Sequence, residues 1–165
     1  MTITLATLTQ ATPQDVFDQV AIHLLRQKAR SAIQYIDEYG LRTFCAFRSD
    51  DGLMCAAGCL MSDDEMRLFE IQNDGGWYPA CERTGIWKHF KLIYTLQELH
   101  DTSPIEAWPS ELARIAKQYN LDTTVLREHT QKTRSTHQVP VAGGEPFERL
   151  VRARLSASSG TTSLA

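Results

Sequence analysis

The chain has 165 residues, of which 42% are hydrophobic and 22% charged, and its formal net charge is −3. This composition is typical of a globular protein, and no apolar run approaches the roughly 18 residues that a membrane helix needs, so we expect no membrane contact. The net charge gives no general attraction to nucleic acid, although residues 121–165 hold 6 Lys and Arg against 4 Asp and Glu. The first residues lack the basic and apolar regions of a secretory signal, which predicts a cytoplasmic protein with reduced cysteines.

The first predicted element is a helix that begins after Thr12. Thr12 can cap the helix, Pro13 suits its first position, and apolar residues then recur at helical spacing to about Lys28. Before it, residues 1–11 alternate in hydrophobicity, which favours a short extended arm. After it, the pattern of residues 31–43 is ambiguous between helix and strand.

A β-hairpin is predicted next. Two short apolar segments, 43–47 and 53–56, read as strands joined by an Asp-rich turn. Gly52 is free to adopt the positive φ that this turn needs. Gly58 lies between apolar residues, where close approach of another backbone is the natural reason for glycine. The predicted hairpin therefore covers about residues 43–57.

Helical patterns dominate the rest of the first 130 residues. Ser62 opens a capping box, Gly85 closes a helix from Trp77, and Asn120 suits the left-handed end of another. The predicted helices start at Ser62 and span 77–84, 86–100, 109–119 and a short segment after Asp122. The fold class is therefore mainly α, or α+β: a compact helical domain over residues 1–130 with one small antiparallel hairpin.

The C-terminal part is predicted to lie outside this domain. Residues 131–145 are polar and contain Pro140 and two glycines, as in a linker, whereas residues 156–165 are rich in Ser and Thr, as in a disordered tail. Between them, residues 146–155 can form an amphipathic helix. Its candidate partner-binding stripe consists of Phe147, Leu150, Val151 and Leu155.

Three of the four cysteines lie within fifteen positions. A structural zinc site needs four ligands, usually from two Cys-x(2–4)-Cys knuckles, and this chain has a single Cys-x3-Cys. A candidate metal or thiol site would combine Cys45, Cys55 and Cys59 with Cys81, His89 or His100. The plainer interpretation is that the thiols are small buried apolar groups, which predicts no cofactor and leaves zinc as the alternative.

Two further constellations have both a chemical and a structural interpretation. Cys59 with His100 and Asp101 is the conceivable thiol nucleophile, base and orienting group, whereas a buried thiol and a histidine at a helix end explain the same residues. The acidic run at residues 63–65 can bind a divalent cation through oxygens, or can simply place negative charge at the positive end of a helix.

Residues 112–129 have a helix-turn-helix layout, which is a candidate for nucleic-acid contact. Candidate contacts to a groove or to phosphates are Thr123, Thr124, Arg127, Lys132 and Arg134. A helix-turn-helix is also a common connection between core helices, and Asp122 and Glu128 reduce the positive charge of this face.

The cysteine segment resembles a known signature. Its pattern, Cys45-x-Phe-Arg-x3-Gly-x2-Cys55-Ala-x-Gly58-Cys-Leu-x2-Asp63-x-Glu, is similar to that of a widespread set of uncharacterised phage and prophage proteins. Residues 12–25, the run Leu96 to Asp101 and the helix at Leu112 are similar as well, so the resemblance covers roughly residues 1–125. The family has no assigned activity, and its members sometimes lack a cysteine at the position of Cys59.

The resulting functional prediction is a non-enzymatic phage or prophage accessory protein that binds a macromolecule, in the cytoplasm of a bacterial host. The expected partner is a host or phage protein, with nucleic acid as a second option, and the sequence does not predict an oligomeric state. The competing hypothesis is a metal-binding module or small enzyme built on Cys45, Cys55, Cys59 and His100.

Overall fold

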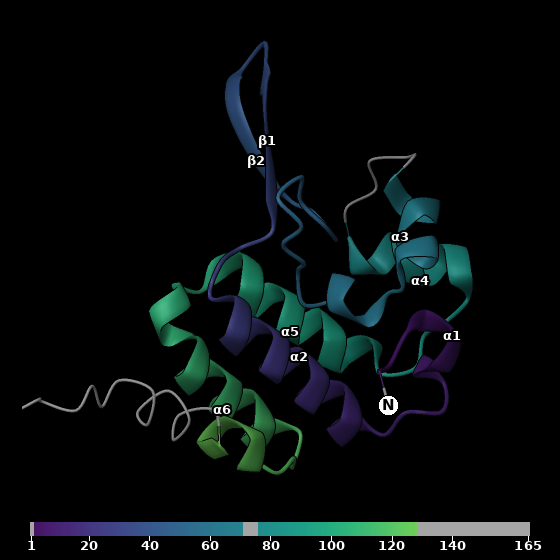
Figure 1. Ribbon diagram of the computed structural model, residues 1–165, viewed down its shortest axis with the longest axis vertical. Helices are drawn as coiled ribbons and strands as arrows, with labels where there is room; N and C mark the ends of the chain where they lie inside the picture. Colours follow the sequence, from purple (N-terminus) through teal and green to yellow (C-terminus); the bar gives the residue numbers. More distant parts are fainter. Residues whose placement is uncertain (1, 71–75, 129–165) are drawn as a thin grey trace, which may run out of the picture. The chain divides into compact units, whose positions relative to one another are not determined.

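The computed structural model describes residues 2–70 and 76–128, which form a mainly helical fold with a small antiparallel sheet (Figure 1). The predicted fold class is confirmed. Within these residues, helices α2 (Pro13–Gln27), α5 (Phe90–Thr102) and α6 (Trp108–Gln118) contact one another in pairs. The shorter helical elements are α1 (Leu5–Leu8), η1 (Gly58–Leu60), α3 (Asp63–Glu70), α4 (Trp77–Thr84) and η2 (Ile105–Ala107). None of the described helices combines the length and apolar character that a membrane crossing requires.

Helix α2 forms as the sequence predicts because both of its ends are fixed locally. The Thr12 hydroxyl accepts a hydrogen bond from the Asp15 N–H at 3.2 Å, and the Asp15 carboxylate accepts the Thr12 N–H at 2.9 Å. At the other end Lys28 takes a left-handed conformation, with φ of 50°, and donates its N–H to Leu24. The helix therefore starts and stops without help from the rest of the fold.

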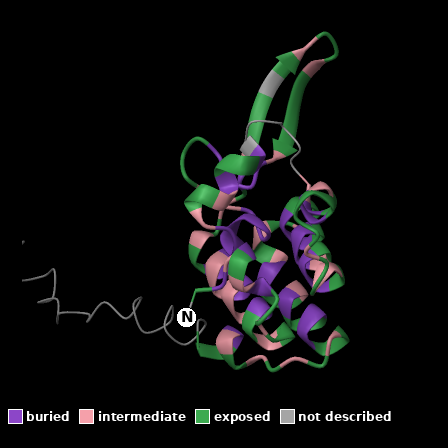
Figure 2. Ribbon diagram, turned by 90° about the vertical axis from the view of Figure 1, so that its right-hand side faces the viewer, coloured by how far each residue is buried: buried purple, intermediate pink, exposed green. Residues whose placement is uncertain are grey.

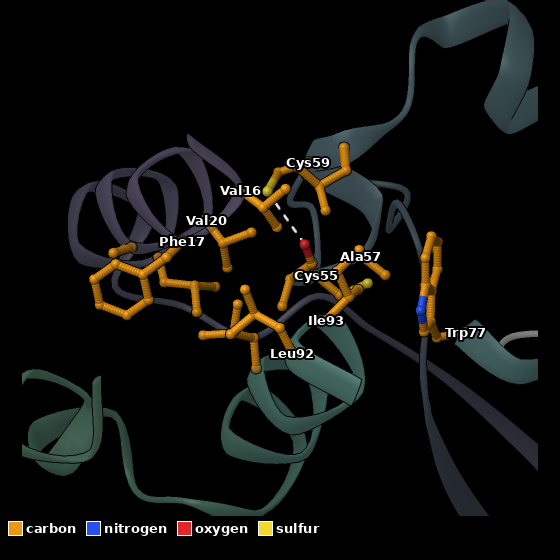
Figure 3. Close-up of a cluster of buried hydrophobic side chains, with 14 of the residues drawn as sticks. Val16, Phe17, Val20, Cys55, Ala57, Cys59, Trp77, Leu92 and Ile93 are labelled. Atoms are coloured by element: carbon orange, nitrogen blue, oxygen red, sulfur yellow. Dashed lines mark hydrogen bonds between the residues drawn. The ribbon is translucent and has the colours of Figure 1, made fainter. Parts of the chain in front are cut away.

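The core lies between α2, α5 and the segment that leads into η1. Val16, Phe17 and Val20 of α2 face Leu92 and Ile93 of α5, and all five are buried (Figure 3). Figure 3 also places Cys55, Ala57 and Cys59 against this cluster. These positions follow the 3.6-residue period of each helix, which is why the sequence pattern predicts them.

The hairpin lies one segment earlier than predicted. Its strands are β1 (Ala32–Asp37) and β2 (Gly40–Cys45), which pair antiparallel with Ile36 opposite Leu41. The strands predicted at 43–47 and 53–56 do not form a ladder: beyond β2 the described chain has a single bridge, between Arg48 and Met54, across the predicted turn. The turn between β1 and β2 is closed by the Asp37 carboxylate, which accepts the Tyr39 N–H at 2.8 Å, and by Gly40 at a φ of 106°.

Both glycines that the sequence singles out have the predicted structural roles. Gly52 has a φ of 81° in the turn between Arg48 and Met54, a conformation that favours glycine. Gly58 lies close against the backbone of Phe47. A Cβ added at Gly58 would lie only 2.7 Å from the Phe47 carbonyl carbon, so no larger residue fits without a shift. The turn and the close approach are thus confirmed, although the strands around them are not.

Two other element boundaries differ from the prediction. The N-terminal arm contains the short helix α1, because the Glu65 carboxylate accepts the N–H groups of Leu5 and Ala6 at its start. Helix α5 begins at Phe90 because His89 has a φ of 61°, which interrupts the predicted helix that starts at residue 86. The predicted linker, C-terminal helix and tail lie outside the described residues.

Candidate functional site

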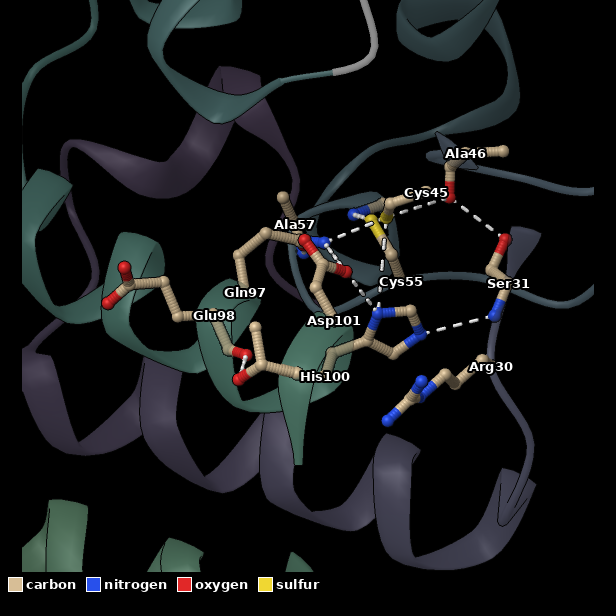
Figure 4. A network of polar contacts seen from close by, with 12 residues as sticks. Arg30, Ser31, Cys45, Ala46, Cys55, Ala57, Gln97, Glu98, His100 and Asp101 are labelled. Atoms are coloured by element: carbon tan, nitrogen blue, oxygen red, sulfur yellow. Dashed lines mark hydrogen bonds and ion pairs between the residues drawn. The ribbon is translucent and has the colours of Figure 1, made fainter. Parts of the chain in front are cut away.

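A polar cluster forms where α5 meets the two ends of the hairpin (Figure 4). Gln97, His100 and Asp101 are spaced three and four residues apart, so they share one face of α5. This face meets Ser31, the residue before β1, and Cys45, the last residue of β2. Figure 4 shows these side chains converging from three segments that are far apart in the sequence.

The hydrogen bonds of His100 define its protonation. Its Nδ1 lies 2.8 Å from Asp101 Oδ1, and its Nε2 lies 3.1 Å from the backbone nitrogen of Ser31. The Ser31 N–H can only donate, so Nε2 must be the unprotonated nitrogen, and the ring proton on Nδ1 points at the carboxylate. His100 is 1% exposed. The contact geometry is therefore that of a buried imidazole with its proton on Nδ1 and an unprotonated Nε2.

Gln97 connects three parts of the cluster. Its side-chain oxygen accepts the Ala57 N–H at 3.0 Å, and its nitrogen donates to Cys45 Sγ and to Asp101 Oδ1, each at 2.8 Å. One amide thus ties α5 to the end of β2 and to the segment before η1. A buried amide with all these partners is a positioning element.

Opposing effects set the charge states in the cluster. Burial alone would raise the pKa of Asp101, but hydrogen bonds from His100 and Gln97 outweigh it and lower that pKa. The pKa of Cys45 is raised, first by its contact with the Cys55 thiol and then by burial. Burial lowers the pKa of His100, whereas Asp101 and Cys45 raise it by more. The Ser31 N–H acts against that increase, because it needs an unprotonated Nε2.

This arrangement does not match that of a thiol nucleophile. A catalytic cysteine and the orienting carboxylate must use opposite nitrogens of the histidine. Here the Cys45 sulfur, at 3.9 Å, and the Asp101 carboxylate both face Nδ1, while Ser31 occupies Nε2. The raised pKa also keeps Cys45 a thiol near neutral pH. The trio differs from the predicted one as well, since the structure brings Cys45, and not Cys59, to His100.

The same geometry bears on metal binding. Ligand atoms of Cys45, His100 and Asp101 lie within 4.8 Å of one another, so three of the four ligands of a zinc ion are close together. A neutral histidine that binds metal through Nδ1 carries its proton on Nε2 and donates it to an acceptor. In this structure Nε2 faces the Ser31 N–H, which is a donor. His100 as it is oriented here is therefore a poor metal ligand.

The other predicted ligands lie elsewhere. Cys55 contacts Cys45, but Cys59 donates to the Ala56 carbonyl and Cys81 is buried in α4. His89 contacts the Ala11 carbonyl at 2.9 Å. Burial raises the pKa of Cys59 to about 12 and that of Cys81 to about 11. These two cysteines match the interpretation as buried apolar groups.

The acidic run at residues 63–65 follows its plainer interpretation. Asp63 pairs with Arg48 at 2.6 Å and Asp64 with Arg67 at 3.0 Å. Glu65 caps its own helix through the Ser62 N–H at 2.7 Å. Each carboxylate thus has a partner within the fold, which favours the structural interpretation of the run.

The hairpin carries the most exposed large apolar side chains of the described chain. Along β1 and β2 the exposed fractions are 81% for Ile36, 64% for Leu41 and 50% for Phe44, and Tyr39 at the turn is 76% exposed. Figures 1 and 2 show the hairpin projecting from the helical body, with exposed residues along it. The sequence does not predict this surface, because the pattern of residues 31–43 is ambiguous between helix and strand. The one sequence feature that could have indicated this surface is the run from Ile33 to Leu41, which is apolar at several positions.

Of the five candidate nucleic-acid contacts, Thr123, Thr124 and Arg127 lie within the described residues. Helical structure resumes at Thr124, whose N–H bonds to Asp122, and the Arg127 guanidinium donates to the Thr124 hydroxyl. Asn120 has the predicted left-handed conformation, with φ of 54°. Thr123 accepts from the next turn through its carbonyl. Lys132, Arg134 and the predicted stripe of Phe147, Leu150, Val151 and Leu155 lie outside the described residues.

Comparison with protein-family models, curated proteins and solved structures finds no match to this chain. The resemblance to phage and prophage proteins therefore stays a hypothesis based on the quoted motifs. Two features of the described residues bear on function: the polar cluster on α5 and the exposed hairpin.

Proposed function

We propose that this chain is a non-enzymatic protein that binds a partner polypeptide through its β-hairpin. The observation that carries the proposal is the exposure of Ile36, Tyr39 and Leu41, which range from 64% to 81% exposed on an element that projects from the core. Large apolar and aromatic side chains grouped on one projecting element are typical of interaction sites. The resemblance to phage and prophage proteins makes a host or phage protein the expected partner.

The backbone of the hairpin also favours a polypeptide partner. In this two-stranded sheet each strand has one neighbour, so one edge of β1 and one edge of β2 are unpaired within the described residues. Natural edge strands are often protected by proline or by charged side chains, above all lysine; residues 32–45 contain no proline or lysine, and Arg42 pairs with Asp37 within the hairpin. An extended segment of a partner can add to such an edge through main-chain hydrogen bonds, and its side chains can cover the exposed apolar residues.

The polar cluster supports this function by fixing the root of the hairpin. An isolated two-stranded hairpin is marginally stable in water, so contacts from α5 to Ser31 and Cys45 provide stability that the strands lack. On this interpretation His100 and Gln97 position the binding element and perform no chemistry.

Two leucines with the same exposure give a matched test. Leu41 on β2 and Leu68 on α3 are both 64% exposed, so replacing each by serine removes a similar exposed side chain from the hairpin and from the helical body. Partners captured by the purified chain from a bacterial lysate are identified by mass spectrometry. The dissociation constant of each purified partner is then measured by calorimetry with both variants.

We expect Leu41→Ser to weaken binding at least about tenfold, and Leu68→Ser to change it by less than about twofold. An Ile36→Ser variant should reproduce the loss. Equal affinity of Leu41→Ser, Ile36→Ser and the unmodified chain for every purified partner would refute the hairpin as the binding element.

A further inference from the structure

We propose that His100 is a proton-sensitive joint, and that protonation of its Nε2 releases the root of β1 from α5. The inference rests on the proposed function in one respect, since the element released is the proposed binding hairpin. The structural part concerns the free protein alone and can be tested without a partner.

The joint consists of one hydrogen bond at each end of the hairpin. At the start of β1 the Ser31 N–H donates to His100 Nε2 at 3.1 Å, and at the end of β2 Cys45 Sγ accepts from Gln97 at 2.8 Å. Both acceptor and donor side chains belong to α5 (Figure 4). The bond at Ser31 ends on an imidazole, whereas the other ends on Cys45, whose raised pKa keeps it a thiol near neutral pH.

Ser31 has no ready substitute for this bond. The residue is fully buried, so water does not reach its N–H, and its hydroxyl is already held by the carbonyls of Ala46 and Leu53. When Nε2 gains a proton, two N–H donors face each other in a buried site. A buried donor left without an acceptor is unfavourable, and moving Ser31 away is the direct way to relieve it.

The surroundings of His100 direct a second proton to Nε2. Nδ1 already carries the first proton, which points at Asp101 Oδ1 at 2.8 Å. The Trp108 ring of α6 packs against the imidazole, with ring centroids 5.6 Å apart, and carries no charge. The titratable or charged groups that face or neighbour His100 are Asp101 on α5, Cys45 at the end of β2, Cys55 behind it, His23 on α2 and Arg30 beside Ser31.

These groups determine the direction of the pH effect. Burial lowers the pKa of His100, but Asp101 and Cys45 raise it further, so that pKa lies above its ordinary value of 6.5. A raised pKa means that the protonated ring contributes stability to the fold at low pH, which is lost as pH rises through the folded-state pKa. Protonation strengthens the pair with Asp101 and breaks the bond to Ser31, so the released joint binds this proton more tightly than the closed joint does. The joint is closed above this pKa and released below it.

The test uses nuclear magnetic resonance on the complete chain between about pH 5 and pH 8.5. The His100 ring resonances give its titration midpoint, and hydrogen exchange, corrected for intrinsic rates, gives the protection of the Ser31 amide. We expect Ser31 protection to fall about tenfold below the midpoint, the effect of losing one buried hydrogen bond. The two midpoints should coincide.

Two variants separate the joint from a general effect of pH. His100→Gln keeps an amide oxygen that can accept from Ser31 and cannot titrate, so Ser31 protection should become independent of pH. Asp101→Asn removes the charge that favours imidazolium, so both midpoints should shift together to lower pH. Ser31 protection that stays constant through the His100 titration would overturn the proposal. If His100→Gln does not fold, the failure of the two midpoints to shift together in Asp101→Asn would overturn it equally.

A binding measurement then links the joint to the proposed function. Affinity for a partner identified through the hairpin variants should be lower below the His100 midpoint than above it in the unmodified chain, and constant in His100→Gln. If Leu41→Ser and Ile36→Ser leave partner binding unchanged, the proposed function fails while the exchange result at Ser31 still decides the joint.

Discussion

Replacing Gly58 by alanine tests whether the segment before η1 depends on a backbone contact. The added Cβ would lie 2.7 Å from the Phe47 carbonyl carbon and 3.1 Å from its Cα, and closer still to its oxygen. Backbone must therefore move, and that same oxygen accepts the Cys55 N–H at 3.2 Å. Overpacking and the loss of a buried hydrogen bond each cost about 1–3 kcal/mol, so the free energy of unfolding should fall by roughly 2–6 kcal/mol.

Urea denaturation followed by circular dichroism measures this change, with Gly52→Ala as the matched control. Gly52 has a φ of 81° and nothing within 4 Å of an added Cβ, so alanine there carries only backbone strain of about 1–2 kcal/mol. Gly58→Ala should therefore be the more destabilising of two identical chemical changes. A Gly58→Ala protein within about 0.5 kcal/mol of the unmodified chain would show that the contact with Phe47 does not constrain the fold.

Two further predictions concern the helix cap and the buried thiols. Glu65→Ala should lower the free energy of unfolding by about 1–3 kcal/mol, because the N–H groups of Leu5 and Ala6 lose their acceptor. Burial acts to raise the pKa of Glu65, but hydrogen bonds from Ser62 and Ala6 outweigh it, and the pKa is lowered overall. The stability that Glu65 contributes is therefore lost as pH falls below the ordinary pKa of 4.5. Melting temperatures measured against pH should show this loss in the unmodified chain. Burial raises the pKa of Cys59 to about 12, so Cys59 should react with an aromatic disulfide reagent at least about a hundredfold more slowly in the folded chain than in the chain unfolded by guanidinium. Rapid labelling of Cys59 in the folded chain, located by mass spectrometry, would contradict this.

The parts of the fold that sequence analysis predicts correctly are those fixed by local contacts. Thr12 and Asp15 cap α2 within three residues of each other, and Gly85 closes α4 with a φ of 69°. The hairpin was misplaced because its sequence pattern is not decisive. Residues 31–43 mix strand and helix periodicity, and the contacts that hold the hairpin to α5, at Ser31 over 69 residues and at Cys45 over 52, are long-range and leave no local pattern.

The polar cluster could be predicted in part. The spacing of Gln97, His100 and Asp101 places all three on one face of a helix, which is readable from the sequence. The choice between Cys45 and Cys59 as the neighbour of His100 is not, since both lie in the same cysteine-rich segment and only the path of the hairpin decides between them. The Ser31 contact uses a backbone N–H, and no side-chain pattern encodes it.

The hairpin separates what folding requires from what binding requires. At its root, Ser31 is fully buried and bonded to α5, so this end depends on the helical body. Toward its turn, Ile36 and Leu41 face each other across the strands while remaining 81% and 64% exposed, so they contribute little burial to folding. Serine at either position should thus leave the core intact while it removes apolar contact surface. His100 lies at the boundary between the two ends, where a change of one proton affects the root without touching the residues proposed to meet a partner.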